Sequence, residues 1–179
     1  LWKNKERVLV LAARGVSFLG RHVMKDLIRM LPHAKTDNKF DSKQNFAVIN
    51  EIAEMKNATK VIFFESRKKS DLYLWISCVP NGPSMKFLLS NLHTTSELKL
   101  TGNCMKTSRP LLSFDEAFED ESLPHYQLLR ELLLQTLGTP NHHPLSQPFV
   151  DKVFTFAMSD DRIWFRNYQI AQENANLAE

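Results

Sequence analysis

The order of apolar and helical segments along the chain predicts an α/β fold. Two short apolar runs, RVLVLAA at residues 7–13 and KVIFFE at residues 60–65, have the composition of buried strands. Residues between these runs place apolar side chains at helical spacing, and a further strand and a hairpin turn follow them. A strand, two helices, a strand and a hairpin in this order are typical of an α/β domain.

The first helix is expected over residues 18–31, because Ser17 is a suitable N-cap and Pro32 ends the pattern. The side chains expected to face the core recur at helical spacing: Leu19, Val23, Leu27 and Met30. Residues 34–44 are polar and predict a loop. Residues 45–55 return to helical spacing and predict a second helix.

A hairpin is expected after the second buried strand. A charged turn at residues 67–71 leads to LYLWISCV at residues 72–79, which predicts a third strand. The tetrapeptide Pro80-Asn81-Gly82-Pro83 predicts a tight turn, because Asn-Gly accepts positive φ at low cost. Residues 85–92 then form the return strand.

A second α/β unit is expected from Leu111 onward, after a polar, basic stretch at residues 94–110. It starts with a short strand at residues 111–114. The clearest helix of the chain follows at residues 123–137, with Pro124 in its first turn and Gly138 after its last. Its apolar face is expected to consist of Leu128, Leu129, Leu132, Leu133 and Leu137.

Another hairpin is expected near the end of the chain. Residues 153–158 and 162–170 alternate apolar and polar side chains around Ser159-Asp160-Asp161. Aromatic residues are concentrated there: Phe154, Phe156, Trp164, Phe165 and Tyr168. Such rings stack on RNA bases in some proteins, but in strands they more often belong to the core. Trp164 and Phe165 point to opposite faces, so at most one of them is expected to face solvent or a partner.

Composition excludes several classes of protein. The chain has 179 residues, of which 43% are hydrophobic and 10% aromatic, so it can build a core and is not a disordered chain. It has no apolar run of the roughly 20 residues that a membrane helix needs, and its charged start does not resemble a signal peptide. The first residue is not Met, so we expect the chain to be part of a longer one.

Familiar catalytic and cofactor motifs are absent from the sequence. Cys78 and Cys104 show no CxxC spacing and are expected to be reduced thiols. None of the five glycines follows a GxGxxG or Walker pattern, and neither HExxH nor GxSxG occurs. The pair His142-His143 lies between prolines and is interpreted as a polar loop rather than a metal site. We therefore expect no catalytic residue, metal or cofactor.

An acidic run at residues 115–121 has five carboxylates in seven positions. A catalytic cluster would need carboxylates held apart in a concave site. Carboxylates placed just before a helix are more simply a solvated loop that complements the helix dipole, and this interpretation is preferred. The run is also suited to docking a basic partner.

Basic residues are spread over several separate segments, and the net charge is +3 with a pI of about 8.9. RNA phosphates require cations spread over a surface rather than a single deep pocket. The helix that begins at Ser17 adds free N–H groups beside Arg14 and Arg21, which favours a phosphate there. Ordinary solvated faces are the alternative explanation. The candidate RNA-binding residues are Lys3, Lys5, Arg7, Arg14, Arg21, Lys25, Arg29, Arg67, Lys68, Lys69, Lys99, Lys106 and Arg109.

Several segments, taken in order, resemble the Brix family. They are WKNKERVLVLAARGVSFLGRHVMKDL from Trp2, PNGPSMKF from Pro80, ELKLTGNCMKTSRPLLSFD from Glu97, HYQLLRELLLQ from His125 and HPLSQPFVDKVFTFAMSDDRIWFRNYQI from His143. Together they span nearly the whole chain. The turn at Arg14-Gly15 matches the strand-to-helix turn of the family, and Pro80-Asn81-Gly82-Pro83 matches its hairpin turn.

The resemblance implies a Brix domain of two related α/β halves, each similar to the anticodon-binding domain of class II aminoacyl-tRNA synthetases. Residues 1–110 would form the first half and residues 111–179 the start of the second, which is expected to be incomplete here. The resemblance further implies a nucleolar, non-catalytic factor of large-subunit ribosome assembly. It would bind ribosomal RNA, ribosomal proteins and other assembly factors, including a homologue of the EBNA-binding nucleolar protein.

Two alternatives to this function remain open at the level of sequence. One is a pure protein-interaction module of the precursor ribosome, in which the basic residues are merely solvated. The other is an RNA-binding appendage of a tRNA synthetase, which would require a catalytic domain elsewhere in the intact protein.

Overall fold

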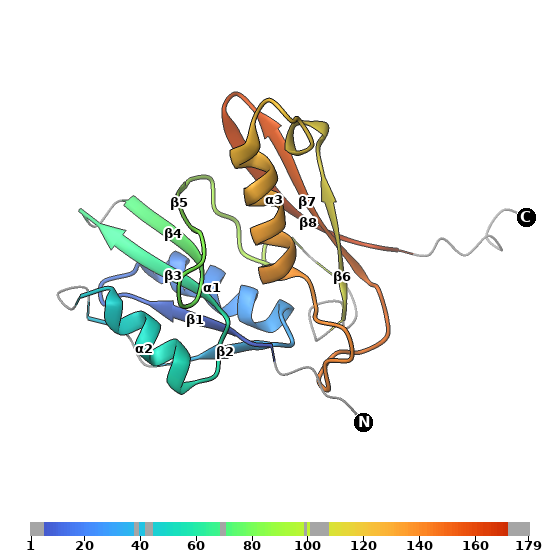
Figure 1. Cartoon of the computed structure of the whole chain (residues 1–179). Helices are drawn as coiled ribbons and strands as arrows, with labels where there is room; N and C mark the ends of the chain where they lie inside the picture. The colour runs from blue at the N-terminus through green and yellow to red at the C-terminus, as the bar shows by residue number, and fades with distance from the viewer. Residues whose placement is uncertain are drawn as a thin grey trace, which may run out of the picture.

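The computed structural model describes residues 6–37, 40–41, 45–68, 71–98, 100 and 108–171. Within them the chain forms a five-stranded sheet and a three-stranded sheet with helices packed against them, which confirms the α/β class (Figure 1). The strand order is β2-β1-β3-β4-β5 in the first sheet and β6-β7-β8 in the second.

The first sheet is parallel on one side and antiparallel on the other. Its strands are β1 (Val8–Ala12), β2 (Ala34–Thr36), β3 (Lys60–Arg67), β4 (Asp71–Cys78) and β5 (Ser84–Leu89). β1 runs parallel to both β2 and β3, whereas β4 is antiparallel to β3 and β5. Every residue of β1 is buried, because helices lie on both sides of this central strand.

The first helix, α1 (Phe18–Met30), begins at Ser17 as expected, and the Ser17 Oγ accepts a hydrogen bond from Gly20 N at 3.2 Å. The prediction that Leu19 faces the core is wrong, because 41% of Leu19 is exposed. Gly20 is buried instead, and a Cβ there would lie 3.0 Å from Leu72 Cδ2. The helix therefore packs closely against the sheet at Gly20, and this orientation turns Leu19 outward.

The loop expected at residues 34–44 contains β2, a three-residue strand paired in parallel with β1. Its residues Ala34, Lys35 and Thr36 lie at the edge of the sheet, so polar side chains are tolerated and no apolar pattern marks the strand. The second helix, α2 (Ala47–Met55), follows and crosses the opposite side of the sheet from α1 (Figure 1).

The turn between β4 and β5 forms where it was expected, but for a different reason. Asn81 and Gly82 are not in the positive-φ region. The glycine is needed because a Cβ at position 82 would collide with the Cβ of Cys78. Cys78 itself is a half-buried free thiol, and Cys104 lies outside the described residues.

The second sheet and its helix come from the last third of the chain. The elements are β6 (Pro110–Phe114), the short 3-10 helix η1 (Glu116–Phe118), α3 (Pro124–Leu137), β7 (Lys152–Ser159) and β8 (Arg162–Gln169). The acidic run is not wholly a solvated loop, because it forms η1 and its Phe118 is fully buried. Leu128 was expected on the apolar face of α3, yet 47% of it is exposed.

The two sheets are joined by α3 and by buried polar contacts. Figure 1 shows α3 between the first sheet and the strands of the second. The Lys152 Nζ, on a residue that is 1% exposed, donates to the Met30 carbonyl at 2.8 Å. The His33 Nε2 lies 3.1 Å from the Thr136 carbonyl oxygen, where it donates as an N–H. These bonds tie the end of α1 and the following turn to β7 and α3.

Candidate nucleic-acid interface

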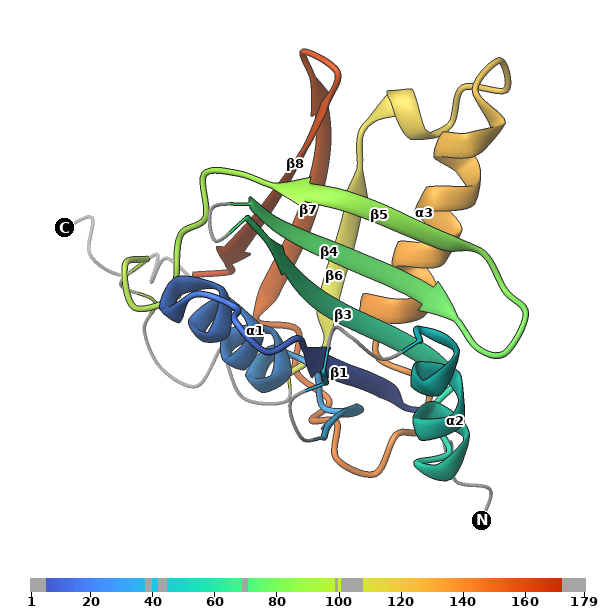
Figure 2. The same ribbon diagram turned by 90° about the vertical axis from the view of Figure 1, so that its left-hand side faces the viewer.

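Three of the candidate cations lie at the edge of the first sheet where its parallel strands end. Arg14 follows the end of β1, Arg67 is the last residue of β3 and Lys68 follows it, and β1 is in parallel register with β3. The start of α1 and the β3–β4 turn lie at this same end of the sheet, on the left in Figure 2. The carboxyl ends of parallel strands are where open α/β sheets usually bind their ligands. We call these residues, with Arg21 and Lys25, the basic edge.

Arg21 and Lys25 extend the basic edge along α1. They are one turn apart, and Lys25 is exposed while Arg21 is half-buried. Neither forms an ion pair with the residues that the structure describes, and the same holds for Lys68. Their charge is thus available to an anion outside the chain.

Other cations of the same region are partly neutralised. Arg14 pairs with Asp41 at 3.3 Å, with 68% of the arginine side chain exposed. Arg29 is 3.8 Å from Asp26. The Arg14–Asp41 pair is largely exposed and contributes little to stability, so a phosphate can compete for Arg14.

The remaining candidates do not join this edge. Arg7 precedes β1 at the opposite end of the sheet and donates to the Lys56 carbonyl at 3.3 Å. Arg109 precedes β6, is half-buried and donates to Ser146 Oγ at 3.4 Å. Five candidates lie outside the described residues: Lys3, Lys5, Lys69, Lys99 and Lys106.

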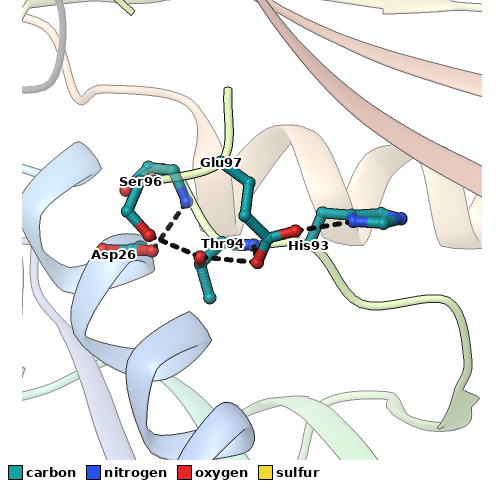
Figure 3. Close-up of polar contacts among 6 residues, drawn as sticks. Asp26, His93, Thr94, Ser96 and Glu97 are labelled. Carbon is teal, nitrogen blue, oxygen red and sulfur yellow. Dashed lines mark hydrogen bonds and ion pairs between the residues drawn. The ribbon is translucent and has the colours of Figure 1, made fainter. Parts of the chain in front are cut away.

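A loop after β5 is fixed against α1 beside the basic edge (Figure 3). The buried Asp26 carboxylate accepts a hydrogen bond from Thr95 N at 3.0 Å. Glu97 closes the loop on itself, because its Oε1 accepts from both the N–H and the hydroxyl of Thr94. The hydrogen bonds from His93 and Thr94 lower the pKa of Glu97 to about 2. This carboxylate is therefore ionised at neutral pH and offsets part of the local positive charge.

An aromatic and cationic cluster on β4 and β5 was missed at the level of sequence. Lys86 Nζ lies 4.2 Å from the Tyr73 ring centroid and 4.8 Å from that of Trp75. Beneath them, Glu65 Oε2 accepts from Trp75 Nε1 at 2.9 Å and Glu65 Oε1 accepts from Arg67 Nε at 2.8 Å. Burial opposes ionisation of Glu65, but these hydrogen bonds outweigh it and hold the pKa of the carboxyl below its usual range.

The sequence of β4 shows no alternation of apolar and polar residues that would indicate this cluster. Every position of LYLWISCV is apolar or small except for the phenol of Tyr73, so the run was interpreted as a buried strand. In β5 the alternation is clearer: Ser84, Lys86 and Leu88 are exposed, and the residues between them are half-buried.

The outer strand of the second sheet also differs from its prediction. Trp164 and Phe165 do lie on opposite faces, but both are exposed, at 38% and 45%. Phe165 packs beside Phe154 and Phe156 and still reaches solvent, because β8 is the last strand in the described sheet. Arg166 lies over the Trp164 ring at 5.5 Å.

Two classes of site are not found within the described part of the chain. No three histidine, cysteine or carboxylate side chains there gather in a way that could hold a metal ion. None of its helices has the length and apolar character of a membrane span. What the arrangement can offer is charge and ring surface for a large polar ligand.

Comparison of the sequence with known proteins identifies the class of protein. Residues 13–179 match the Brix domain family, and the chain belongs to that family. It is 60% identical over 178 residues to the ribosome biogenesis protein BRX1 homolog of Homo sapiens, and 57% identical over 180 residues to that of Caenorhabditis elegans. These matches cover 99% and 100% of the chain, which spans about half the length of these relatives.

A solved structure resembles the fold more distantly. It is the crystal structure of a probable ribosomal biogenesis protein from Aeropyrum pernix K1, with a TM-score of 0.56 and 14% sequence identity. The match covers 90% of this chain and 88% of that one. The resemblance to the Brix family that the sequence motifs indicated is thus confirmed.

Proposed function

We propose that the chain is a non-catalytic factor of ribosome assembly that binds ribosomal RNA in the large-subunit precursor. The observation that carries this proposal is the basic edge, where exposed cations converge from β1, α1 and the β3–β4 turn. Relatives that are 60% identical are named for ribosome biogenesis. Cations spread over a surface suit the phosphates of a folded RNA, which lie along an extended path.

The proposed mechanism is mass action on RNA conformations. A protein that binds one fold of an RNA more tightly than another shifts the population toward that fold. The chain would thereby hold precursor RNA in one arrangement until processing proceeds. This role needs no cofactor and no reacting side chain.

Partners and location follow from the same proposal. The chain would act in the nucleolus, beside ribosomal proteins and other assembly factors, including a homologue of the EBNA-binding nucleolar protein. We also propose that residues 1–110 and 111–179 correspond to two halves of the domain. This division is supported by the two sheets, because β1 to β5 are hydrogen-bonded in one sheet and β6 to β8 in the other.

Charge reversal tests the proposal. The triple variant Arg14→Glu/Arg21→Glu/Lys25→Glu is compared with the wild type for binding a large-subunit precursor RNA fragment over a salt series. If all three residues contact phosphates, the slope of log affinity against log salt should fall by about 2 units. Arg162→Glu/Arg166→Glu is the control, because both residues are exposed on β8, away from the basic edge. An equal slope for the triple variant and the wild type would contradict the proposal.

A pure protein-interaction module remains the second candidate, because apolar side chains are exposed on and near the second sheet. They are Leu111, Leu145, Phe149, Val150, Trp164, Phe165, Tyr168 and Ile170. This candidate is favoured if the triple variant still enters precursor particles while Trp164→Ser/Tyr168→Ser does not. The opposite result favours RNA as the main attachment.

A further inference from the structure

In the part of the chain that the structure describes, no helix covers the side chains on the side of β4 and β5 that faces α2. Trp75 lies on this side, because its ring is 5.9 Å from the ring of Phe46, which precedes α2. Strand alternation places Tyr73 on the same side, and cross-strand pairing with Trp75 and Tyr73 adds Lys86 and Leu88. Within the described residues α2 lies beside β1 and β3, and β4 and β5 remain open (Figure 2). We call Glu65, Tyr73, Trp75, Lys86 and Leu88 the open face.

The exposed charges at the end of β3, beside the open face, are positive. Arg67 and Lys68 are exposed, and 28% of the Lys86 side chain is accessible. The carboxylates of the same region lie deeper: Glu65 is 5% exposed, and Asp71 is half-buried at the start of β4. Glu65 is therefore less accessible to a ligand than any of these three cations.

Aromatic rings accompany these cations. Tyr73 and Trp75 are half-buried, so part of each ring is accessible, and Leu88 is 60% exposed beside them. Lys86 lies over both rings and also 3.7 Å from Glu65 Oε2. Glu65 also accepts hydrogen bonds from Trp75 and Arg67, so it keeps these partners if the Lys86 ammonium group moves to a phosphate and leaves a ring for a base.

The open face is continuous with the basic edge through Arg67, which belongs to the end of β3 and also bonds to Glu65. From these observations we propose that the open face binds unpaired bases of an RNA strand whose phosphates contact the basic edge. Tyr73 and Trp75 stack on bases, and Lys86 moves from the rings to a phosphate. The inference rests on the proposed function and deepens it, because it selects single-stranded rather than duplex RNA.

Comparing single-stranded with duplex RNA separates the contribution of the open face from that of the basic edge. Bases within a duplex are stacked on one another and cannot lie flat on a protein ring, whereas its phosphates remain available to the basic edge. Stacking on one aromatic ring changes affinity by about tenfold or more. The open face should therefore strengthen binding of a single strand and leave binding of a duplex unchanged.

The test uses the intrinsic fluorescence of Trp75. In a Trp2→Phe/Trp164→Phe background, Trp75 is the remaining tryptophan of the sequence. The protein is titrated with oligouridine of about ten nucleotides and with a duplex RNA of equal length at constant salt. We expect the single strand to quench Trp75, with the duplex producing much less quenching. Tyr73→Leu should weaken binding of the single strand by about tenfold and leave the duplex affinity unchanged.

Tyr168→Leu is the matched control, since it removes an exposed ring of the second sheet and should leave both affinities unchanged. If Tyr73→Leu binds the single strand as tightly as the wild type, or if Trp75 is not quenched, the inference is overturned. The proposed function would survive that result as long as RNA binding remains dependent on salt and on Arg14, Arg21 and Lys25. Absence of any salt-dependent RNA binding by the wild type would instead overturn the proposed function itself.

Discussion

Acidification should destabilise the protein through His33, which lies in the turn between α1 and β2 and is 3% exposed. Burial lowers its pKa to about 4, against a weaker opposing effect of the hydrogen bond to the Thr136 carbonyl. The other ring nitrogen, Nδ1, has no partner in the described structure. Protonation would therefore place a charge in a site that can satisfy only one of its two N–H groups.

The sign and the size follow from linkage. The pKa of His33 is lower in the folded state than the ordinary value of 6.5, so the unfolded chain binds the proton more tightly. The contribution to stability is complete above pH 6.5 and is lost as pH falls toward 4. A difference of 2.5 pKa units corresponds to about 3 kcal/mol in total, of which about 2 kcal/mol is lost by pH 5.

The assay is the free energy of unfolding in urea at about pH 7.5 and about pH 5, for the wild type and His33→Gln. Glutamine can still donate an N–H toward the Thr136 carbonyl but does not titrate. Acidification should cost the wild type about 2 kcal/mol more than it costs the variant. His143→Gln is measured beside it to separate the two neighbouring histidines. The His143 ring lies 6.0 Å from the His33 ring, and burial lowers the pKa of His143 as well. Equal losses in the wild type and His33→Gln would refute the reasoning.

Three further substitutions probe the packing. Lys152→Met removes the hydrogen bond to α1 and should cost about 1–3 kcal/mol, measured as a lower urea midpoint; an unchanged midpoint would show that this bond contributes nothing. Gly82→Ala forces a Cβ against Cys78 and should cost about 1–3 kcal/mol by thermal melting, whereas a neutral effect would mean that the turn relaxes freely. Asp26→Ala leaves the Thr95 N–H without its acceptor, so residues 93–97 should be cut faster in limited proteolysis, and unchanged cleavage would contradict this anchoring.

Most elements of the fold could be predicted from local patterns. The strand Val8–Ala12 and the helix Pro124–Leu137 carry strong apolar signals, and both form close to the expected positions. The strand Ala34–Thr36 could not be predicted, because its structure comes from pairing with a neighbour rather than from its own side chains. The exposure of Leu19 depends on where α1 approaches the sheet, which periodicity does not specify.

The candidate site was less accessible to sequence reasoning. Residue type identified Arg14 and Arg67 as possible phosphate contacts, but their common position depends on the parallel register of β1 and β3. That register cannot be predicted from the sequence of either strand alone. The role suggested for Tyr73 and Trp75 was hidden for a related reason, because a strand with apolar residues at nearly every position does not reveal which face a helix will leave open.

The buried bond between Lys152 and the Met30 carbonyl has a consequence for synthesis of the chain. A nascent chain emerges from its N-terminus, so β1 to β5 are complete long before Lys152 has been made. Until then the last turn of α1 has to rely on water to bind the carbonyl of Met30. The first sheet therefore acquires its full stability only after β7 has left the translating ribosome.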